Sequence, residues 1–360
     1  MVVQDIFRNL QETDTILIMN GGENAIDKTF FYLTGAESGL FEGSAVIANE
    51  DRIELIAYNL EEQSARETGK EVTVVDTKRQ MEEKVAEKLK GKNKIGVNLE
   101  SLTANMFSSI KKLLPGSEFI DVSKIIADAR TTKSPDEIKK LREAARIGSE
   151  IYTDVLDNLK EGMKETDVAA DLVHGMMRGG ATGPSFMPIV GFGSNSSIPH
   201  YFPGERKLKK GDFVLTDYGA LYKRYCSDIT RTAVFGRATD QQKEMYEIVR
   251  RAQMESMHMI KAGANGRLVD RKALEVIDAT KYKGRFMHGL GHGLGLEVHD
   301  HSALGRTEDL ELKENMAITV EPGIYIPDYG GVRIEDDVLV KKDGFEQITG
   351  NSSKELLEVS

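Results

Sequence analysis

Residues 216–232 read TDYGALYKRYCSDITRT, and this stretch carries two aspartates, Asp217 and Asp228, at the inner ends of two apolar runs. We expect strands at Phe213–Asp217 and Asp228–Val234, which the loop between them, rich in Gly and Tyr, folds into a hairpin. A single aspartate at a strand end is more often a turn residue. The hairpin, however, would bring both carboxylates side by side, within reach of one pair of ions.

Two glutamates repeat this arrangement further along the chain. Glu321 lies in ITVEPGIYI (318–326) and Glu335 in GGVRIEDD (330–337), on either side of a turn at residues 328–331. Apolar residues flank both glutamates, so each lies in a strand that otherwise has the pattern of a buried one. Because glutamate is almost never fully buried without a partner, two such pairs of carboxylates in one domain favour a shared chemical role.

A glycine-spaced run, HGLGHGLGLEVH at 288–299, carries His292 with a glycine on each side. Glycine there permits close backbone approach or a positive φ, as a strand or bulge at an active site needs. A lone histidine usually has a structural role. Five of the seven histidines, however, lie in this run, just after it or in the loop that follows Ile198-Pro199: His200, His288, His292, His299 and His301. This clustering favours chemistry.

Four carboxylates and one imidazole aimed at one place predict a metal centre. The carboxylates would repel one another and shift their pKa values steeply unless cations lay between them. Two divalent ions would neutralise that charge, so we expect a dinuclear metallohydrolase. Oxygen donors with one imidazole and no thiolate favour Mn²⁺ or Co²⁺, with catalytic Zn²⁺ or Fe²⁺ as alternatives. Cys226 has no second cysteine to pair with, and nucleophilic catalysis by its thiol is not expected.

The composition is that of a globular protein, with 40% hydrophobic and 29% charged residues among 360. No transmembrane helix is expected, because no run of about 18 apolar residues occurs. The first residues lack the basic and apolar regions of a signal peptide. A single cysteine and a net charge of −10 favour a cytoplasmic enzyme with small substrates and argue against nucleic acid as a partner.

Residues 1–125 are predicted to form a small α/β domain in which short β-rich runs alternate with amphipathic helices. We expect strands at 15–19, 29–33, 45–48, 53–58, 72–75 and 95–97, the third and fourth as a hairpin, and helices at 79–90 and 102–114. No cluster of chemically active residues lies here. We therefore expect roles in packing, in oligomer contacts and in shaping access to the second domain.

Residues 126–360 are predicted to form an α+β domain. Ser134-Pro135-Asp136-Glu137 is a capping box with Pro at the first helical position, so a long helix should begin there. Further helices are expected from about residue 166, at 239–261 and at 266–279, with strand pairs from Gly211 onward. Long helices beside antiparallel hairpins indicate α+β architecture rather than a doubly wound parallel sheet.

The five potential ligands, taken with their local contexts, resemble a known family. SDITRT, GHGLGLEVH, EPGIY and GGVRIED, in this order, are similar to the motifs of the proline-specific members of the pita-bread metallopeptidases, the prolidases and Xaa-Pro aminopeptidases. TKSPDEIKKLREA resembles the entry into their catalytic domain, and the segment before it resembles a creatinase-type N-terminal domain. The resemblance spans nearly the whole chain and implies a pita-bread (creatinase/aminopeptidase-like) catalytic domain that holds two divalent ions.

The resemblance also implies how the ligands are divided between the two ions. Asp217 and Asp228 would bind one metal, with Asp228 bridging to the other. His292 and Glu321 would bind the second metal, and Glu335 would bridge. Glu321 also matches the family's proton shuttle, which activates the hydroxide that bridges the metals and attacks the scissile carbonyl.

Four residues match the family's catalytic and substrate-binding groups. His200 and His299 match two histidines that face the substrate, polarise the scissile carbonyl and handle the leaving nitrogen. Arg333, two residues before Glu335, matches an arginine of the catalytic network. Phe186 matches the position of a residue in the specificity pocket. The implied substrates are small peptides with proline in the second position.

One departure from the family concerns substrate length. Many prolidases carry an arginine shortly after the motif's second histidine, proposed to hold the C-terminal carboxylate of the dipeptide. Here no arginine stands at that place, near Ala303, and Arg306 comes three residues later. The leading interpretation is an Xaa-Pro dipeptidase (prolidase), and the alternative is an Xaa-Pro aminopeptidase that accepts longer peptides.

Two further classes can be weighed against these. A methionine aminopeptidase resembles only the second half of the chain. A non-enzymatic pita-bread module that binds peptides would be expected to lose metal ligands, whereas all five are present here. The resemblance also implies a homodimer.

Overall fold

The computed structural model describes residues 6–307, 309–350 and 354–360 and divides into two compact units, Met1–Arg130 and Thr131–Ser360. The division falls at the end of helix α6 (Ser123–Thr131), an element that the sequence did not predict. The expected boundary at 125/126 lies inside this helix, a few residues earlier. Each unit has its own hydrophobic core.

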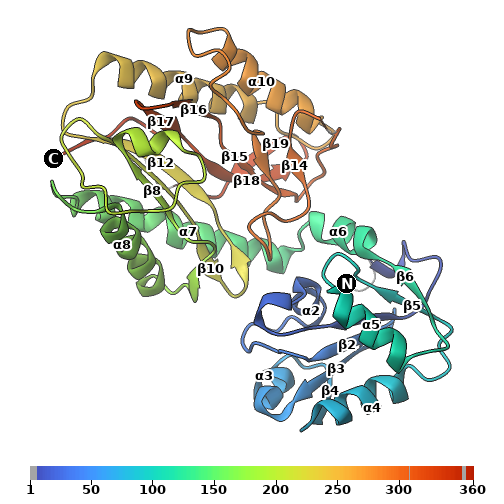
Figure 1. Cartoon of the computed structure of the whole chain (residues 1–360). Coiled ribbons are helices and arrows are strands. Elements are labelled where there is room, and N and C mark those ends of the chain that lie inside the picture. The colour runs from blue at the N-terminus through green and yellow to red at the C-terminus, as the bar shows by residue number, and fades with distance from the viewer. Residues whose placement is uncertain (1–5, 308, 351–353) are drawn as a thin grey trace. The chain divides into compact units, whose positions relative to one another are not determined.

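Within the described residues, the first unit is built on one mixed six-stranded sheet in the order β4-β3-β2-β1-β5-β6 (Figure 1). Its strands are β1 (Ile16–Met19), β2 (Ala45–Ala48), β3 (Ile53–Tyr58), β4 (Glu71–Val75), β5 (Lys94–Val97) and β6 (Glu118–Asp121). Its helices are α2 (Lys28–Thr34), α3 (Glu62–Glu67), α4 (Lys78–Lys88), α5 (Ala104–Leu113) and α6, with 3₁₀ turns at Glu23–Ala25 and Asn59–Glu61. The expected hairpin of β2 and β3 is present, and side chains of α4 and α5 pack with strand residues in the core.

The strand expected at 29–33 is wrong, because these residues lie in helix α2. Asp27 caps the helix by accepting a hydrogen bond from the backbone N–H of Thr29 (2.8 Å), and Gly35 ends it at φ 71°. All the residues of TFFYL are buried. A short continuous apolar run fits a buried helix as well as a buried strand, so its pattern alone cannot separate the two.

The second unit has long helices beside short, mostly antiparallel sheets, which is the expected α+β architecture. Its helices are α7 (Pro135–Asp157), α8 (Glu165–Arg178), α9 (Asp240–Met257) and α10 (Gly266–Asp278). The predicted capping box is present at α7, where Ser134 accepts from the N–H of Glu137 and Glu137 accepts from that of Ser134. Among the described residues, no helix is both long and apolar enough to span a membrane.

The strands of the second unit form several small sheets, with orders β20-β12-β9-β8, β11-β10-β7, β15-β18-β19, β16-β17 and β13-β14. They are β7 (Gly183–Pro184), β8 (Ile189–Phe192), β9 (Phe213–Tyr218), β10 (Ala220–Tyr222), β11 (Tyr225–Cys226), β12 (Ile229–Phe235), β13 (Gly291–His292), β14 (Ala303–Leu304), β15 (Ala317–Val320), β16 (Gly323–Ile326), β17 (Gly330–Arg333), β18 (Asp336–Lys341), β19 (Gly344–Gln347) and β20 (Glu358–Val359). A 3₁₀ helix, η3 (Gly193–Ser197), follows β8.

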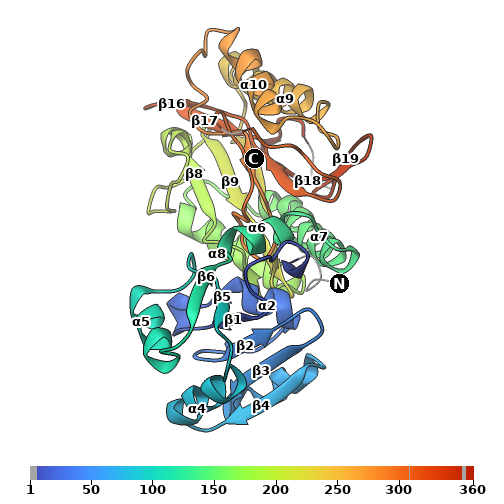
Figure 2. The ribbon, with the colours of Figure 1, turned by 90° about the vertical axis from the view of Figure 1, so that its right-hand side faces the viewer.

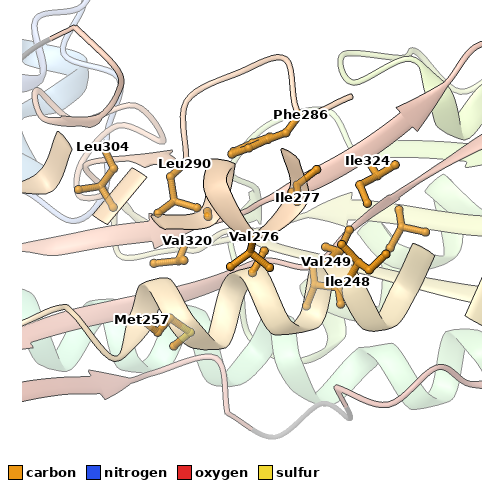
Figure 3. Close-up of a cluster of buried hydrophobic side chains, with 14 of the residues drawn as sticks. Ile248, Val249, Met257, Val276, Ile277, Phe286, Leu290, Leu304, Val320 and Ile324 are labelled. Carbon is orange, nitrogen blue, oxygen red and sulfur yellow. The ribbon is translucent and has the colours of Figure 1, made fainter. Parts of the chain in front are cut away.

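Two hydrophobic cores hold the helix pairs of the second unit against these strands. Figures 1 and 2 show α7 beside α8 and α9 beside α10. Side chains of α7 and α8 pack with β8, β9 and β12. In the other core, Ile248 and Val249 of α9 and Ile277 of α10 lie in one cluster with Val320 and Ile324 (Figure 3). Each buried side chain of this size contributes about 1.5–3 kcal/mol, so both cores fix the strands that carry the predicted ligands.

Candidate metal centre

Asp217 and Asp228 lie on the same face of the β9–β12 pair. Asp217 is opposite Thr230 in this antiparallel pair, and Asp228 precedes Thr230 by two residues, so both carboxylates project the same way. The expected pairing of the two strands is present. Their connection is more than a simple turn, because β10 and β11 form a short antiparallel pair within it.

Glu321 and Glu335 lie where the chain crosses between two sheets. β15 pairs with β18 in one sheet and β16 pairs with β17 in another. Glu321 follows β15 and Glu335 precedes β18, so each glutamate occupies one of the two crossings. The backbone N–H of Glu335 donates to the carbonyl oxygen of Thr230 (3.0 Å). This hydrogen bond ties the crossing that carries Glu335 to β12, the strand that follows Asp228.

Glycines beside His292 let its strand approach the neighbouring backbone closely. A Cβ at Gly291 would lie 2.0 Å from the carbonyl oxygen of Thr319, and a Cβ at Gly293 would lie 2.2 Å from that of Asp300. Neither glycine has a positive φ. Of the two explanations that the sequence offered for this spacing, close approach is the one that applies.

The hydrogen bonds of His292 fix which of its nitrogens faces the carboxylates. Nδ1 lies 3.1 Å from the carbonyl oxygen of Gly293, and because a carbonyl oxygen can only accept, Nδ1 carries the hydrogen. The lone pair is therefore on Nε2, which lies 3.6 Å from Asp228 Oδ2 and 3.5 Å from Glu321 Oε1. Burial lowers the pKa of His292 to about 4, so the ring is neutral, which is the form that binds a metal ion.

Burial raises the pKa values of three of the clustered carboxyl groups. It raises that of Glu321 to about 8. It raises those of Asp228 and Glu335 well above their ordinary range, with a further rise from the charges of neighbouring carboxylates, Glu335 acting on Asp228 and Glu321 acting on Glu335. Negative charge at this place is therefore costly without a cation.

The same carboxylates keep buried oxygen atoms with no partner. Among the described residues, Oδ1 of Asp217, Oδ1 of Asp228 and Oε1 of Glu335 are buried and accept no hydrogen bond. Ligand atoms of Asp228, His292 and Glu335 all lie within 4.8 Å of one another. Buried carboxylate oxygens are unfavourable unless hydrogen-bonded or bound to a cation. The residues present therefore fit a divalent metal centre.

Arg333 connects this cluster to groups that the sequence reading did not select. Its Nη2 contacts Asp217 Oδ2, and its Nε donates to Thr230 Oγ1 (3.0 Å). Its Nη1 donates to the hydroxyl of Tyr325 (2.9 Å), which lies 2.9 Å from Nε2 of His288. Because Nδ1 of His288 donates to the next carbonyl oxygen (2.8 Å), Nε2 accepts and Tyr325 is the donor. The donor and the acceptor of each hydrogen bond from Arg333 through Tyr325 to His288 are therefore fixed.

Thr230 and two buried aspartates support the predicted ligands and were also missed. Thr230 donates to Glu335 Oε2 (2.5 Å), and Asp337 accepts from the backbone N–H of Asp228 (2.9 Å). Asp336 forms an ion pair with Arg231 (2.7 Å), in which both side chains are almost fully buried. A signal was present in the sequence, since three consecutive carboxylates, Glu335 to Asp337, stand in a strand that is otherwise apolar.

All nine predicted site residues line one cavity of about 740 Å³. Beyond the five potential ligands, these are Phe186, His200, His299 and Arg333. The ring of His299 lies 4.2 Å from that of His292, centroid to centroid. Burial, with a further effect from His200, lowers the pKa of His299. His288 also lines the cavity, whereas His301 is not among its lining residues.

Comparison with known proteins is consistent with this geometry. Residues 139–342 match the model of metallopeptidase family M24, and residues 3–132 match the creatinase/prolidase N-terminal domain. The Xaa-Pro dipeptidase of Pyrococcus furiosus is 36% identical over 342 residues, which is 93% of this chain and 96% of that protein.

Solved structures of similar proteins cover nearly the whole length of the chain. The Xaa-Pro dipeptidase from Bacillus anthracis superposes with a TM-score of 0.91 at 36% identity, covering 99% of each chain. The X-Pro aminopeptidase from Thermotoga maritima superposes with a TM-score of 0.92 at 32% identity, covering 98% of this chain and 99% of the other. The chain therefore belongs to metallopeptidase family M24, with a creatinase/prolidase N-terminal domain ahead of the catalytic domain.

Proposed function

We propose that this metallopeptidase is a dinuclear-metal-dependent Xaa-Pro dipeptidase. The observation that carries the proposal is the convergence of buried carboxylate oxygens without hydrogen-bond partners and the Nε2 atom of His292 on one cavity. The similarity to proteins named Xaa-Pro dipeptidase over nearly the whole chain supports the choice of substrate. A binding module without activity is not favoured, because the chain belongs to a family of peptidases and keeps every predicted ligand.

Asp217 and Asp228 would hold one divalent ion, His292 and Glu321 the other, and Asp228 and Glu335 would lie between the two. Mn²⁺ or Co²⁺ is proposed, with Zn²⁺ or Fe²⁺ as alternatives, because the donors are oxygens and one imidazole. Such ions lower the pKa of bound water and polarise a carbonyl oxygen.

Glu321 is proposed as the proton shuttle. Its carboxyl group lines the cavity, and burial raises its pKa to about 8. That value holds for the metal-free protein, and a bound cation would favour the carboxylate, the form that can accept a proton and later return it. Arg333 is proposed to hold Asp217 and, through Thr230, the Glu335 carboxylate in place.

The substrate would lie against the two histidines that line the cavity. His200 and His299 are proposed to stabilise the oxygen of the scissile carbonyl and to handle the leaving nitrogen, and Phe186 is proposed to contact the substrate side chain. An Xaa-Pro bond has no N–H, so a peptidase that binds its substrate as an added strand loses a hydrogen bond there. A cavity that acts on the carbonyl does not need that donor.

Hydrolysis of Ala-Pro and Met-Pro by protein loaded with Mn²⁺ or Co²⁺ tests the proposal. Cleavage of both dipeptides, no cleavage of Ala-Ala, and loss of activity in Asp228→Ala and Glu335→Ala are expected. Retained activity in either variant would contradict the site assignment. No cleavage of any Xaa-Pro peptide, with metal bound, would contradict the proposed function.

An Xaa-Pro aminopeptidase is the second candidate. It is favoured by the close superposition with the Thermotoga maritima X-Pro aminopeptidase and by the absence of an arginine at position 303. We further propose that the enzyme is a cytoplasmic homodimer. Its molecular mass in solution, against 39.9 kDa for one chain, tests the dimer.

A further inference from the structure

We propose that Glu165 is a positioning residue that holds His200 in its place in the cavity, by bonding to the loop that carries this histidine. Because His200 has a role only within the proposed function, the proposal rests on that function. Glu165 is fully buried and is not among the described lining residues of the cavity. It would therefore act on the reaction only through another residue.

Glu165 is the first residue of α8, and its carboxylate accepts four hydrogen bonds from one segment, residues 192–204, which contains His200. The donors are the backbone N–H of Phe192 (2.9 Å) and the side-chain amide of Asn195 (2.9 Å) on Oε1, and the hydroxyl of Tyr201 (2.9 Å) and the backbone N–H of Gly204 (3.0 Å) on Oε2. One buried carboxylate thus binds both ends of this segment.

Tyr201 and Asn195 also bond to each other. Nδ2 of Asn195 donates one hydrogen to Glu165 and the other to the hydroxyl oxygen of Tyr201 (2.8 Å). Burial and the hydrogen bond to Glu165 raise the pKa of Tyr201 to about 12, so the hydroxyl keeps its hydrogen and donates it. The three side chains form a closed ring of hydrogen bonds, and such a network holds its members more firmly than isolated bonds do.

His200 lies between two parts of the loop that are both held. On its N-terminal side, η3 is joined to β17, because the hydroxyl of Ser196 accepts from the backbone N–H of Gly331 (2.8 Å). On its C-terminal side, Tyr201 is held by Glu165. The backbone on both sides of His200 is therefore fixed to the body of the second unit.

Packing alone does not hold this loop. Ile198 and Phe202, the apolar residues on either side of His200, are 50% and 78% exposed. The ring of His200 is itself exposed and forms no hydrogen bond with the described residues. Its place in the cavity therefore follows from its backbone, and so from the bonds between Glu165 and the loop.

The position of His200 matters because a group that stabilises a reacting bond has to be placed closely. A displacement of about 1 Å can lower the rate of the chemical step by about 100-fold. Glu165 is therefore expected to affect catalysis without touching the substrate or the predicted metal ligands.

Two variants test the proposal on Mn²⁺-loaded full-length protein with Ala-Pro as the substrate. Tyr201→Phe removes only the hydroxyl, and Glu165→Gln replaces an acceptor oxygen with an NH₂ group that faces donors. In both variants, kcat is expected to fall by about 10- to 100-fold, with KM changed by less than about threefold, because His200 acts on the bond as it breaks. Mn²⁺ affinity is expected to stay the same, since His200 is not a predicted ligand. An unchanged kcat in Tyr201→Phe overturns the proposal.

Combination with His200→Ala separates positioning from a general structural role. If Glu165 and Tyr201 act through His200, Tyr201→Phe causes little further loss of kcat in a protein that already lacks the imidazole. The same fold-loss in both backgrounds overturns the proposal, because the hydroxyl would then act independently of His200.

The position of His200 can also be followed without catalysis. The ¹³C-histidine NMR spectrum of the metal-free protein contains a His200 signal, identified by its absence from the spectrum of His200→Ala. This signal is expected to broaden or split in Tyr201→Phe and in Glu165→Gln, as the ring samples more than one position. An unchanged signal in both variants overturns the proposal. If the native protein cleaves no Xaa-Pro peptide, the proposed function is contradicted, while the NMR comparison still decides whether Glu165 positions His200.

Tyr282→Phe is the matched control. The hydroxyl of Tyr282 also donates to a helix glutamate, Glu244 (3.3 Å), and Tyr282 is not among the described lining residues of the cavity. This variant is expected to keep the kcat and the His200 signal of the native protein. A comparable loss of kcat in Tyr282→Phe would show that losing any such tyrosine bond lowers activity, and would overturn the specific role of Glu165.

Discussion

Thr230 holds two groups of the candidate site with one hydroxyl. It donates to Glu335 Oε2 and accepts from Arg333 Nε. Replacing it with valine keeps the β-branched shape but removes both bonds, so Glu335 and Arg333 each lose a partner in a buried place. Supporting residues of this kind typically alter metal affinity or activity by about 10- to 100-fold.

We therefore expect Thr230→Val to lower metal affinity, activity or both by about 10- to 100-fold, while Thr230→Ser retains most of each. Calorimetric titration of the metal-free protein with Mn²⁺ measures the affinity, and hydrolysis of Ala-Pro measures the activity. Equal affinity and activity in the valine variant and the native protein would show that the hydroxyl plays no part in holding the site.

The buried carboxyl groups predict how metal removal changes stability with pH. Burial raises the pKa values of Asp228, Glu321 and Glu335, that of Glu321 from 4.5 to about 8. Between these values the metal-free folded protein holds protons that the unfolded chain has released. The contribution of these carboxyl groups to the free energy of unfolding therefore falls as the pH rises through that interval.

The Tm of metal-free protein is expected to fall from about pH 6.5 to about pH 8, because below this range the buried histidines, whose pKa values are lowered, act in the opposite direction. The increase in Tm on adding Mn²⁺ is expected to grow over the same range, because metal binding needs deprotonated ligands. Thermal unfolding with a chelator and with Mn²⁺ at several pH values measures both. In Asp228→Asn the dependence on pH should be weaker. A metal-free Tm that rises steadily over this range is the contrary result.

The side chains that meet at the cavity could be selected from the sequence as candidate ligands because charged residues are conspicuous inside apolar strands. Asp217, Asp228, Glu321 and Glu335 all stand out in this way, and the glycine spacing marks His292. Thr230 and Tyr325 could not be found by the same reasoning, since threonine and tyrosine are ordinary strand residues. Only the folded structure shows that their hydroxyl groups face the carboxylates and arginine.

At the scale of elements, β13, the strand that contains His292, can lie beside β15 only because Gly291 has no side chain. A Cβ at Gly291 would lie 2.0 Å from the carbonyl oxygen of Thr319, so β13 cannot keep its place beside β15 with any larger residue. A contact with backbone cannot be relieved by a change of rotamer, and overpacking typically costs about 1–3 kcal/mol or more.

Gly291→Ala is expected to lower the Tm by several degrees, at about 2–4 °C per kcal/mol for a domain of this size, and to weaken Mn²⁺ binding because His292 moves with its strand. Gly344→Ala is the matched control, since nothing lies within 4 Å of a Cβ there. Thermal unfolding and metal titration of both variants provide the comparison. Similar behaviour of the two would argue against close approach as the reason for the glycine.

Elements were predictable where their ends carry local signals. Helix α7 has a capping box and a proline at its first turn, and it begins where the sequence indicated. Helix α2 was mistaken for a strand because it contains the continuous apolar run Phe30–Leu33 and because six of its seven residues are buried. The two-residue strands β13 and β14 leave no periodicity to detect, and tertiary contacts alone define them.

At the scale of the second unit, an ion pair joins residues far apart in the sequence. Lys133, just before α7, contacts Asp300, just after His299, with Nζ 3.1 Å from Oδ2 and side chains 1% and 2% exposed. Removing one partner leaves the other charge buried, which typically costs about 3–5 kcal/mol.

Lys133→Met is expected to destabilise the protein by about 3–5 kcal/mol, measured by denaturant unfolding. Lys139→Met, at an exposed position on α7, should have little effect. The double variant Lys133→Met/Asp300→Asn should be more stable than the sum of its single variants predicts. Strict additivity would show that the pair does not act as a unit.

The fold class followed from the sequence, because the change from alternating strands and helices to long helices with hairpins is visible over many residues. The crossing of the chain between the β15-β18-β19 and β16-β17 sheets did not follow from it. The sequence indicated only the turn that joins β16 and β17. The pairing of β15 with β18, which lie on either side of that hairpin in the sequence, was not indicated.

The placement of the ligands at two distant parts of the chain also has a consequence for biosynthesis. Asp217 leaves the ribosome 118 residues before Glu335, an interval of roughly 6–24 seconds at about 5–20 residues per second. During this interval Asp228, His292 and Glu321 emerge in turn, and the set stays incomplete until Glu335 has been added. A growing polypeptide therefore cannot complete the candidate metal centre until the final hairpin has been synthesised and has folded.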